Sequence, residues 1–189
     1  MTSRIEALYR KGSISDDGII EAVSKGWITT DEAVEILGED NELEVVRQIK
    51  LAEISKACNA LIVAGVDVEF DEETLHFNLA TEDQANISNL FRIVELGGTE
   101  YPYQSDGGVC QVFTAAQIAQ IYIAAQTLIT TQTTYHNELK SYVQSLESTE
   151  DIEAVTYGMD LPDAYAAEMA EKLSVAQTQM DAIVAALGG

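Results

Sequence analysis

The chain has 189 residues, of which 47% are hydrophobic, and its 32 acidic residues against 10 basic residues give a net charge of −22. Because nearly half of the residues are apolar, the charge does not indicate disorder, and the length allows one compact domain with an appendage. So acidic a chain excludes binding to nucleic acid through its own basic surface, and it disfavours docking on an anionic membrane leaflet.

Cysteine content, the N-terminus and hydropathy indicate the cellular setting. Two cysteines, Cys58 and Cys110, are too few for a disulfide framework, and we interpret them as reduced, packed thiols, with one disulfide as the alternative. The first residues lack the apolar core of a secretion signal, and no apolar run approaches the roughly 20 residues that span a bilayer. We therefore expect a soluble protein, made in the cytoplasm, without membrane insertion.

The first forty residues contain a repeated helix-boundary motif, in which Lys-Gly is followed by an isoleucine and then by Ser15 or Thr29. A lysine favours the negative end of a helix dipole, a glycine ends the helix, and a Ser or Thr caps the next one. The pattern predicts short helices over 3–11, 16–25 and 30–37. Trp27, with Ile14 and Ile28, either forms the small core of this module or docks on something larger.

Residues 41–98 change from a helical to a strand period and back. Asn41 can cap a helix that runs to Gly65, with apolar residues three or four positions apart. Strict alternation then predicts a hairpin of 66–70 with 75–79. Residues 81–84, Thr-Glu-Asp-Gln, have capping-box spacing for the next helix, which ends at Gly97-Gly98.

The second half begins with a hairpin of 99–104 with 109–113 around an Asp-Gly turn, in which Pro102 places its strand at a sheet edge. Residues 114–117 form another capping box, and a long helix follows to about 148. A short helix over 150–155 and a final helix from 163 complete the chain. The final helix carries an apolar stripe typical of an antiparallel pair or coiled coil, made of Tyr165, Met169, Leu173, Ala176, Met180, Ile183 and Leu187.

These elements predict a mainly α (α+β) protein. A short N-terminal helical module is followed by a small antiparallel hairpin sheet with packed helices and by long C-terminal helices. The predicted domains are 1–40, 41–157 and 158–189. Residues 93–189 hold only 2 of the 10 basic residues, and they are rich in Ala, Thr and Gln, a composition that suits helices packed on each other or on partners.

Two stretches resemble phage proteins. Residues 5–37 resemble the XkdX family, small proteins of phages of Gram-positive bacteria that are encoded among tail genes. The matching residues are Lys11, Gly12, Ile14, Ser15, Lys25, Gly26, Trp27, Ile28, Thr29 and Glu32. Residues from about 47 to 157 are similar to an uncharacterised domain that recurs in phage tail-fibre and tail-fibre-assembly proteins, on the segments 53–58, 82–87, 106–107, 113–118 and 153–157. The resemblance implies a location in the virion tail.

No common enzyme motif occurs in the sequence. We interpret His76, between Leu75 and Phe77, as solvated, and His136 as exposed or facing a partner. The acidic run of residues 69–73 could bind a hard cation, but it lacks the glycine of an EF-hand loop, so a solvated hairpin tip is the favoured interpretation. We therefore expect no catalytic residue, no metal site and no cofactor.

The functional hypothesis is a phage virion structural or assembly protein of the tail tip, baseplate or tail fibre. Its partners would be other phage tail or fibre proteins and further copies of itself. Aromatic residues and methionine favour interfaces, and the predicted partner-contact residues are Trp27, Tyr101, Tyr103, Tyr135, Tyr142 and Met169. The alternatives are a tail-fibre assembly chaperone, absent from the mature particle, whose charge would shield a basic client, and a small metal-dependent enzyme.

Overall fold

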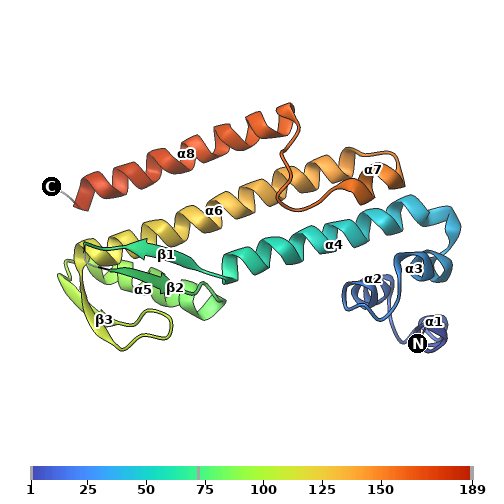
Figure 1. Cartoon of the computed structure of the whole chain (residues 1–189), viewed down its shortest axis with the longest axis horizontal. Coiled ribbons are helices and arrows are strands. Elements are labelled where there is room, and N and C mark those ends of the chain that lie inside the picture. Colours follow the sequence, from blue (N-terminus) through green and yellow to red (C-terminus); the bar gives the residue numbers. More distant parts are fainter. Residues whose placement is uncertain (1, 72, 188–189) are drawn as a thin grey trace. The chain divides into compact units, whose positions relative to one another are not determined.

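The computed structural model of the chain describes residues 2–71 and 73–187, and these residues form eight α-helices, one short 3-10 helix and four β-strands (Figure 1). Helices predominate, and the strands pair as two separate antiparallel hairpins. The predicted fold class, mainly α with α+β character and long C-terminal helices, is confirmed.

The chain divides into two compact units, each built from two stretches that lie far apart in the sequence. The first unit comprises Met1–Ala57 with His136–Ala166, and the second comprises Cys58–Tyr135 with Ala167–Gly189. The long helices α4 (Glu42–Val63), α6 (Ala115–Ser145) and α8 (Asp163–Leu187) contribute residues to both units.

The first unit opens with three short helices, α1 (Thr2–Arg10), α2 (Asp16–Ser24) and α3 (Thr30–Leu37), close to the predicted ranges. The hydroxyl of Ser15 accepts a hydrogen bond from the amide of Gly18, and Thr29 forms a complete capping box with Glu32. The repeated motif in the sequence therefore forms two helix boundaries of the same kind.

A small core closes this helical module. Ile19 and Ala33 have no exposed surface, and Ile28 is also buried. Trp27 does not join them, because 51% of its surface is exposed. The interpretation of Trp27 as a core residue is therefore wrong.

The 3-10 helix η1 (Glu39–Asn41) links this module to α4, and α7 (Thr149–Ala154) follows α6. Asn41 does not cap α4 as predicted. Its side-chain amide donates to the carbonyl of Leu37 instead, and so satisfies a free acceptor at the end of α3. Ser148 caps α7, and α6 ends at Ser145, a few residues earlier than predicted.

The second unit contains both hairpins. Strand β1 (Val66–Glu69) pairs with β2 (Thr74–Phe77), and β3 (Glu100–Tyr103) pairs with β4 (Gln111–Thr114). Helix α5 (Thr81–Glu95) lies between the hairpins in the chain. Each sheet has only two strands, so Pro102 does lie at an edge, opposite Val112.

Aromatic rings pack with aliphatic side chains such as Leu79, Ile87 and Ile118 in the core of the second unit. Phe77 and Phe113, both buried, meet edge-on with ring centroids 6.0 Å apart, and Phe70 lies 5.9 Å from Phe113. The ring of Phe91 on α5 stacks on Tyr122 of α6 at 4.1 Å. These contacts pack the two hairpins on each other and α5 on α6, and two-stranded sheets require such packing in order to be stable.

Two capping boxes predicted for this unit have different outcomes. The box at Thr114 is confirmed, since the amide of Gln117 donates to its hydroxyl and its own amide donates to the Gln117 side chain. The box at Thr81 is wrong, because Ala80 is the N-cap residue of α5 and has no side-chain acceptor. The side chain of Gln84 donates to the Leu79 carbonyl instead.

Candidate functional site

The structure divides the predicted contact residues between the two units. Trp27 and Tyr142 belong to the first unit, whereas Tyr101, Tyr103, Tyr135 and Met169 belong to the second. Trp27 and Tyr101 are exposed, and the other four are half-buried.

Trp27 is the only tryptophan of the chain, and it lies three residues after the end of α2. The ammonium of Lys25 lies 4.8 Å from the centre of its ring, within cation–π range, and the same ammonium pairs with Glu21 at 2.7 Å. With the cation on one side, the ring still presents a large apolar surface to solvent.

The two tyrosines of strand β3 differ in their surroundings. Tyr103 stacks on Phe77 with parallel rings, 6.2 Å apart, and burial together with the charge of Asp83 raises its pKa above the usual value. Tyr101, opposite Phe113 in the hairpin, keeps 40% of its surface exposed. Tyr103 therefore packs on the core, whereas Tyr101 is still open to a partner.

The apolar stripe of α8 is half-covered. In the first unit the ring of Tyr165 packs on Tyr142, and its hydroxyl donates to Ser145 at 3.0 Å. In the second unit α6 and α8 line a common cavity of about 130 Å³, between residues 127–131 and residues 173–180. Each described stripe residue from Tyr165 to Ile183 keeps intermediate exposure. The side chain of Leu187, the last stripe residue, lies outside the described residues.

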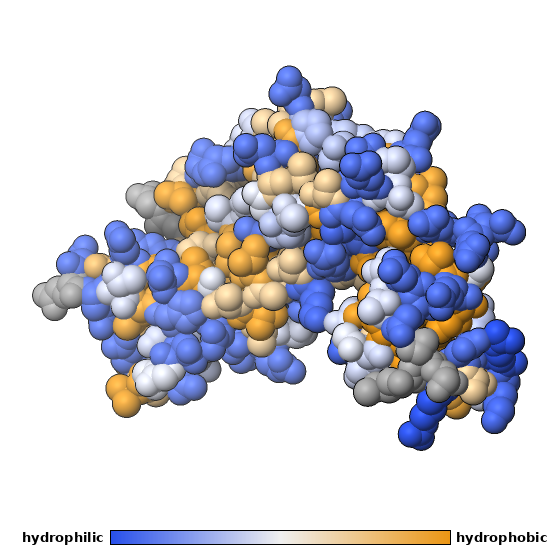
Figure 2. Space-filling view, turned by 45° about the vertical axis from the view of Figure 1, so that its right-hand side comes forward, coloured by the Kyte–Doolittle hydropathy of each residue, from blue (hydrophilic) through white to orange (hydrophobic). Residues whose placement is uncertain are grey.

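Several large apolar side chains are more than half exposed. Figure 2 shows hydrophobic residues gathered between hydrophilic ones on one face of the molecule. Val109 and Val112 in and beside strand β4, Val175 and Val184 on α8, and Leu96 after α5 are all in this class. Cys110 is exposed between the first two, while Cys58 is buried, so the expectation of two packed thiols holds for Cys58 alone.

His76 keeps 39% of its side chain exposed, in line with the prediction that it is solvated, but its ring is also held in place by two hydrogen bonds. Its Nδ1 lies 2.7 Å from a carboxylate oxygen of Asp67, and its Nε2 lies 2.8 Å from the Ala64 carbonyl. Because both nitrogens face acceptors, the doubly protonated ring fits best, and the hydrogen bond to Asp67 is the largest cause of its raised pKa. This imidazole therefore joins the end of α4 to the first hairpin.

The described residues of the acidic run at the hairpin tip belong to no metal-binding group. Glu69, Asp71 and Glu73 are exposed, and Glu72 lies outside the described residues. Across the part of the chain that the structure describes, no three His, Cys, Asp or Glu side chains are placed to hold a metal ion.

A groove of about 460 Å³ lies in the first unit, between α2, α4 and the end of α6. Ile20 and Leu51 supply apolar lining, while Glu21, His136 and Lys140 supply polar groups. Burial is the main cause that lowers the pKa of His136, and the charge of Lys140 adds to it. His136 is thus half-buried in a groove and does not lie on an open surface.

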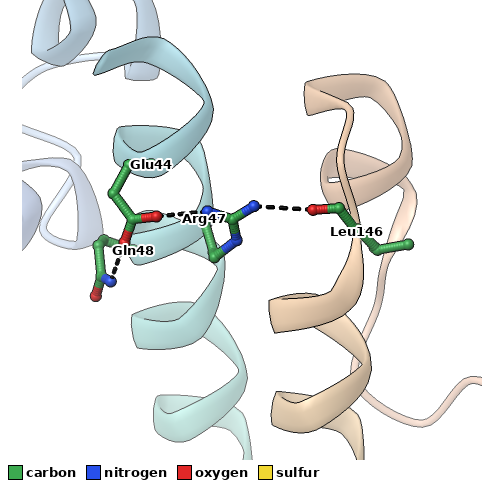
Figure 3. Close-up of polar contacts among 4 residues, drawn as sticks. All are labelled: Glu44, Arg47, Gln48 and Leu146. Carbon is green, nitrogen blue, oxygen red and sulfur yellow. Dashed lines mark hydrogen bonds and ion pairs between the residues drawn. The ribbon is translucent and has the colours of Figure 1, made fainter.

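Two basic residues of α4 bind backbone carbonyls just beyond the end of α6 and at the end of α7. The guanidinium of Arg47 donates to the Leu146 carbonyl at 2.8 Å, just beyond α6, and it pairs with Glu44 (Figure 3). Gln48 donates to the other oxygen of Glu44, which is the largest cause of the lowered pKa of that carboxyl. The Nε atom of Arg47 is buried without a partner in the described chain.

Lys50, one turn further along α4, is only 8% exposed. Its ammonium donates to the carbonyls of Glu153 and Val155, at 3.2 and 2.8 Å, where α7 ends. Cations favour the carboxyl ends of helices, whose last carbonyls have no partner within the helix. Arg47 and Lys50 are called here the basic clamp. Our sequence interpretation missed it, although two bases three residues apart in so acidic a chain were a usable signal.

The chain belongs to a protein family described as a domain of unknown function (DUF4376), whose model matches residues 45–157. Both sides of the basic clamp lie inside this range, so the clamp joins the first and last parts of the family's segment. No curated protein and no solved structure matches the chain. None of its described helices is both long and apolar enough to cross a membrane.

Proposed function

We propose that the chain is a non-enzymatic structural component of a phage tail, at the tail tip, the baseplate or the fibre base, and that it acts through protein–protein contacts. The resemblance of residues 5–37 and of about 47–157 to tail-associated proteins supports this setting. One observation supports the mechanism above all others. Trp27 is half-exposed although the core of its own module, around Ile19, Ile28 and Ala33, is closed without it.

Burying the exposed part of a tryptophan would contribute strongly to association. Tryptophan is enriched among the few residues that carry most of the binding free energy at interfaces, and Lys25 already restrains the ring in the free protein. A side chain that is ordered before binding loses less entropy on association. Trp27 is therefore suited to anchor a partner protein.

Helix α8 supports the same mechanism in the second unit. Between Leu173 and Leu187 its only charged residue is Asp181. Val175 and Val184 stand nine residues apart, and so point to opposite sides of the helix, yet both are more than half exposed. A helix that is apolar on several sides is usually buried, which favours further contacts with tail proteins or with another copy of the chain.

Quantitative mass spectrometry of purified particles of a phage that encodes the chain tests the location. A structural component is present at a fixed copy number per particle. Finding the protein only in the lysate would contradict the proposal and support the rival function, a tail-fibre assembly chaperone. A stoichiometric metal in the purified protein, measured by elemental analysis, would support the metal-dependent enzyme.

A pair of variants tests the anchor. Trp27→Ala removes the ring. It is expected to weaken binding to a partner tail protein, or to reduce incorporation of the chain into particles, roughly thirtyfold, the effect of a hot spot of about 2 kcal/mol. Lys25→Ala removes the cation above the ring, leaves the ring in place, and should have a much smaller effect. Circular dichroism checks that both variants remain folded. Equal behaviour of the two variants would contradict the role of Trp27.

A further inference from the structure

The sequence contains two Asp-Gly pairs, Asp17-Gly18 and Asp106-Gly107, and the structure places them in different surroundings. The first pair lies in the first turn of α2, in the first unit. The second pair lies in the loop between β3 and β4, in the second unit. In such a pair the glycine nitrogen can attack the carboxyl group of the preceding side chain, because glycine has no Cβ atom to obstruct the approach. The chain therefore offers the same chemistry once in a helix and once in a turn.

The loop between β3 and β4 is anchored on both sides of the second pair. The amide of Asp106 donates to the His76 carbonyl at 2.8 Å, and the amide of Gly108 donates to the Ser105 carbonyl at 3.0 Å. The second bond closes a β-turn, whose central peptide joins Asp106 to Gly107. Neither anchoring bond uses the oxygen or the nitrogen of this central peptide, so the peptide can rotate while both bonds stay in place.

Both reacting groups of the second pair are unoccupied. Within the part of the chain that the structure describes, the carboxylate of Asp106 and the amide of Gly107 make no hydrogen bond and no ion pair. Both residues are exposed, so water reaches them. The φ of Gly107 is +64°, and a Cβ atom there would meet nothing within 4 Å. Since glycine adopts negative φ as readily, the central peptide can turn its nitrogen towards the carboxyl group.

The first pair is held in a way that prevents the same approach. Asp17 and Gly18 have helical backbone, and the Gly18 amide donates at 3.4 Å to the hydroxyl of Ser15, the N-cap residue of α2. Gly18 is also closely packed, because a Cβ atom there would lie 3.3 Å from the Cβ atom of Ile14. The Gly18 nitrogen can reach the Asp17 carboxyl group only after the first turn of α2 opens, and local opening costs free energy.

We propose that Asp106 is a site of spontaneous covalent modification, where the folded chain permits conversion of aspartate to isoaspartate while it suppresses the same reaction at Asp17. The Gly107 nitrogen attacks the side-chain carboxyl carbon of Asp106 and a C–N bond forms. The C–O bond to the carboxyl hydroxyl breaks, and the hydroxyl leaves with the amide proton as water. Water then opens the succinimide ring at the main-chain carbonyl carbon, which frees an α-carboxyl group. Nothing is oxidised or reduced, and water is the only co-reactant.

The product changes the main chain of the loop and keeps its carboxylate. The chain now passes through the side-chain carbon of residue 106, so the backbone gains an extra carbon atom inside the turn. The hydrogen bond between Gly108 and Ser105 spans this residue, and the bond to the His76 carbonyl begins at it. The modification therefore alters the loop that joins β3 to β4. The proposal goes beyond the assembly function and does not depend on it.

The test is a time course on the full wild-type chain, incubated for weeks at physiological temperature and then digested with chymotrypsin. Cleavage after aromatic residues places the two pairs in separate peptides, and electron-transfer dissociation distinguishes isoaspartate from aspartate. A parallel incubation in guanidinium chloride gives the two rates without turn or helix. Relative to these denatured rates, isoaspartate at Asp106 should form at least about tenfold faster than at Asp17, the factor for a local opening free energy of about 1.4 kcal/mol.

A pair of variants tests the attacking atom. Gly107→Ala places a methyl group beside the nitrogen, in open space, and should slow the reaction at Asp106 several-fold. Gly97→Ala is the matched control, because it introduces the same kind of backbone strain at another open, positive-φ glycine of the second unit and should leave the rate unchanged. The NMR spectrum checks that the second hairpin is retained in both variants.

Two results with the wild-type chain would overturn the proposal, and neither depends on a variant. One is an absence of isoaspartate at Asp106 in the folded chain over a period in which the denatured chain forms it. The other is an equal rate at Asp106 and Asp17 after correction for the denatured rates, since the turn would then give no advantage over the helix. Equal rates in Gly107→Ala and Gly97→Ala would likewise contradict attack by the Gly107 nitrogen.

Discussion

Gly65 joins α4 to β1 at a point where no side chain fits. Its φ of +88° lies in the left-handed region, and a Cβ atom there would lie 2.3 Å from the Phe77 carbonyl oxygen and 2.8 Å from the Asn78 Cα. Both neighbours are backbone atoms, so a small side-chain movement cannot relieve the clash. We expect Gly65→Ala to lower the free energy of unfolding by at least about 3 kcal/mol, measured by urea denaturation.

Gly97 provides the matched control for this substitution. It lies in the same unit, its φ is +93°, and a Cβ atom there would meet nothing within 4 Å. Gly97→Ala therefore adds only the backbone strain, about 1–2 kcal/mol. If both variants lost the same stability, the close approach at Gly65 would have no energetic consequence.

We expect the two histidines to cause losses of stability on opposite sides of pH 6.5, the ordinary pKa of the side chain. The pKa of His76 is raised by its hydrogen bond to Asp67, so its contribution is complete below pH 6.5 and is lost as the pH rises through the folded-state pKa. The pKa of His136 is lowered by burial, so its contribution is present above pH 6.5 and is lost as the pH falls through the folded-state pKa.

Urea unfolding at a series of pH values checks this expectation. His76→Gln should remove the loss of stability above pH 6.5 and keep the loss below it. His136→Gln should remove the loss of stability below pH 6.5 and keep the loss above it. The effect of His76 should stay below about 1 kcal/mol, because its side chain is 39% exposed and solvent screens the pair. An alkaline loss that survives His76→Gln would contradict the assignment.

At the level of the element, the same four-residue pattern has two different outcomes. Thr-x-x-Gln occurs at Thr81 and at Thr114, but only Thr114 caps a helix. We expect Thr114→Ala to lower the free energy of unfolding by about 1 kcal/mol. Thr81→Ala, in the first turn of α5, should change it by less than about 0.5 kcal/mol. Thermal unfolding of the two variants makes the comparison, and equal losses would contradict the cap assignment.

This contrast shows how far the sequence predicts the elements. The helix and hairpin ranges were predicted within a few residues, because periodicity and glycines are local signals. The cap of α5 was not, because the helix begins one residue earlier. The placement of Ala80 there depends on the buried Leu79 before it and on Gln84, which donates to the Leu79 carbonyl. That is a tertiary constraint, and spacing within the sequence does not contain it.

Prediction of the candidate sites from the sequence meets the same limit. Sequence reasoning selected Trp27 as a contact but left open whether it was buried, because exposure depends on how α2 and α3 pack. It missed the basic clamp, whose acceptors are backbone carbonyls about a hundred residues away in the chain. It also missed a polar pocket of about 140 Å³ in the second unit, because its lining residues, Asp83 and Ser105 among them, come together only when α5 packs beside the second hairpin. Long-range pairs of this kind leave no periodic signal.

We expect the loss of one charge from the basic clamp to lower the stability of the protein strongly. Lys50→Met keeps the aliphatic stem and removes the ammonium, so the carbonyls of Glu153 and Val155 lose their donor in a buried place. We expect the free energy of unfolding to fall by roughly 2 kcal/mol. Lys56→Met is the control, because Lys56 is exposed and, within the described part of the chain, donates only to the Ser24 carbonyl at 3.3 Å, and it should cost less than about 0.5 kcal/mol. Similar losses in the two variants would argue against the clamp.

At the scale of the whole molecule, charge repulsion should dominate the response to salt. The 10 basic residues can neutralise only part of the 32 acidic ones, so most carboxylates repel one another. Ion pairs oppose this repulsion. Those of Arg10 with Glu6 and of Lys172 with Glu168 are exposed and join residues one helical turn apart, and such pairs contribute about 0.3–0.5 kcal/mol each. We expect salt to stabilise the protein, since it screens long-range repulsion more than it weakens these few contacts.

Urea unfolding at two ionic strengths tests the balance. Between about 0.01 M and 0.15 M sodium chloride the Debye length falls from about 30 Å to about 8 Å, and the free energy of unfolding should rise by on the order of 1 kcal/mol. A variant with Glu147→Gln and Asp160→Asn, two exposed positions outside the helices, should be more stable than the wild type at low salt and gain less from added salt. A specific ion effect would raise both proteins equally. A stability that falls with salt would mean that the ion pairs outweigh the repulsion, and the net charge would then have little influence on the folded state.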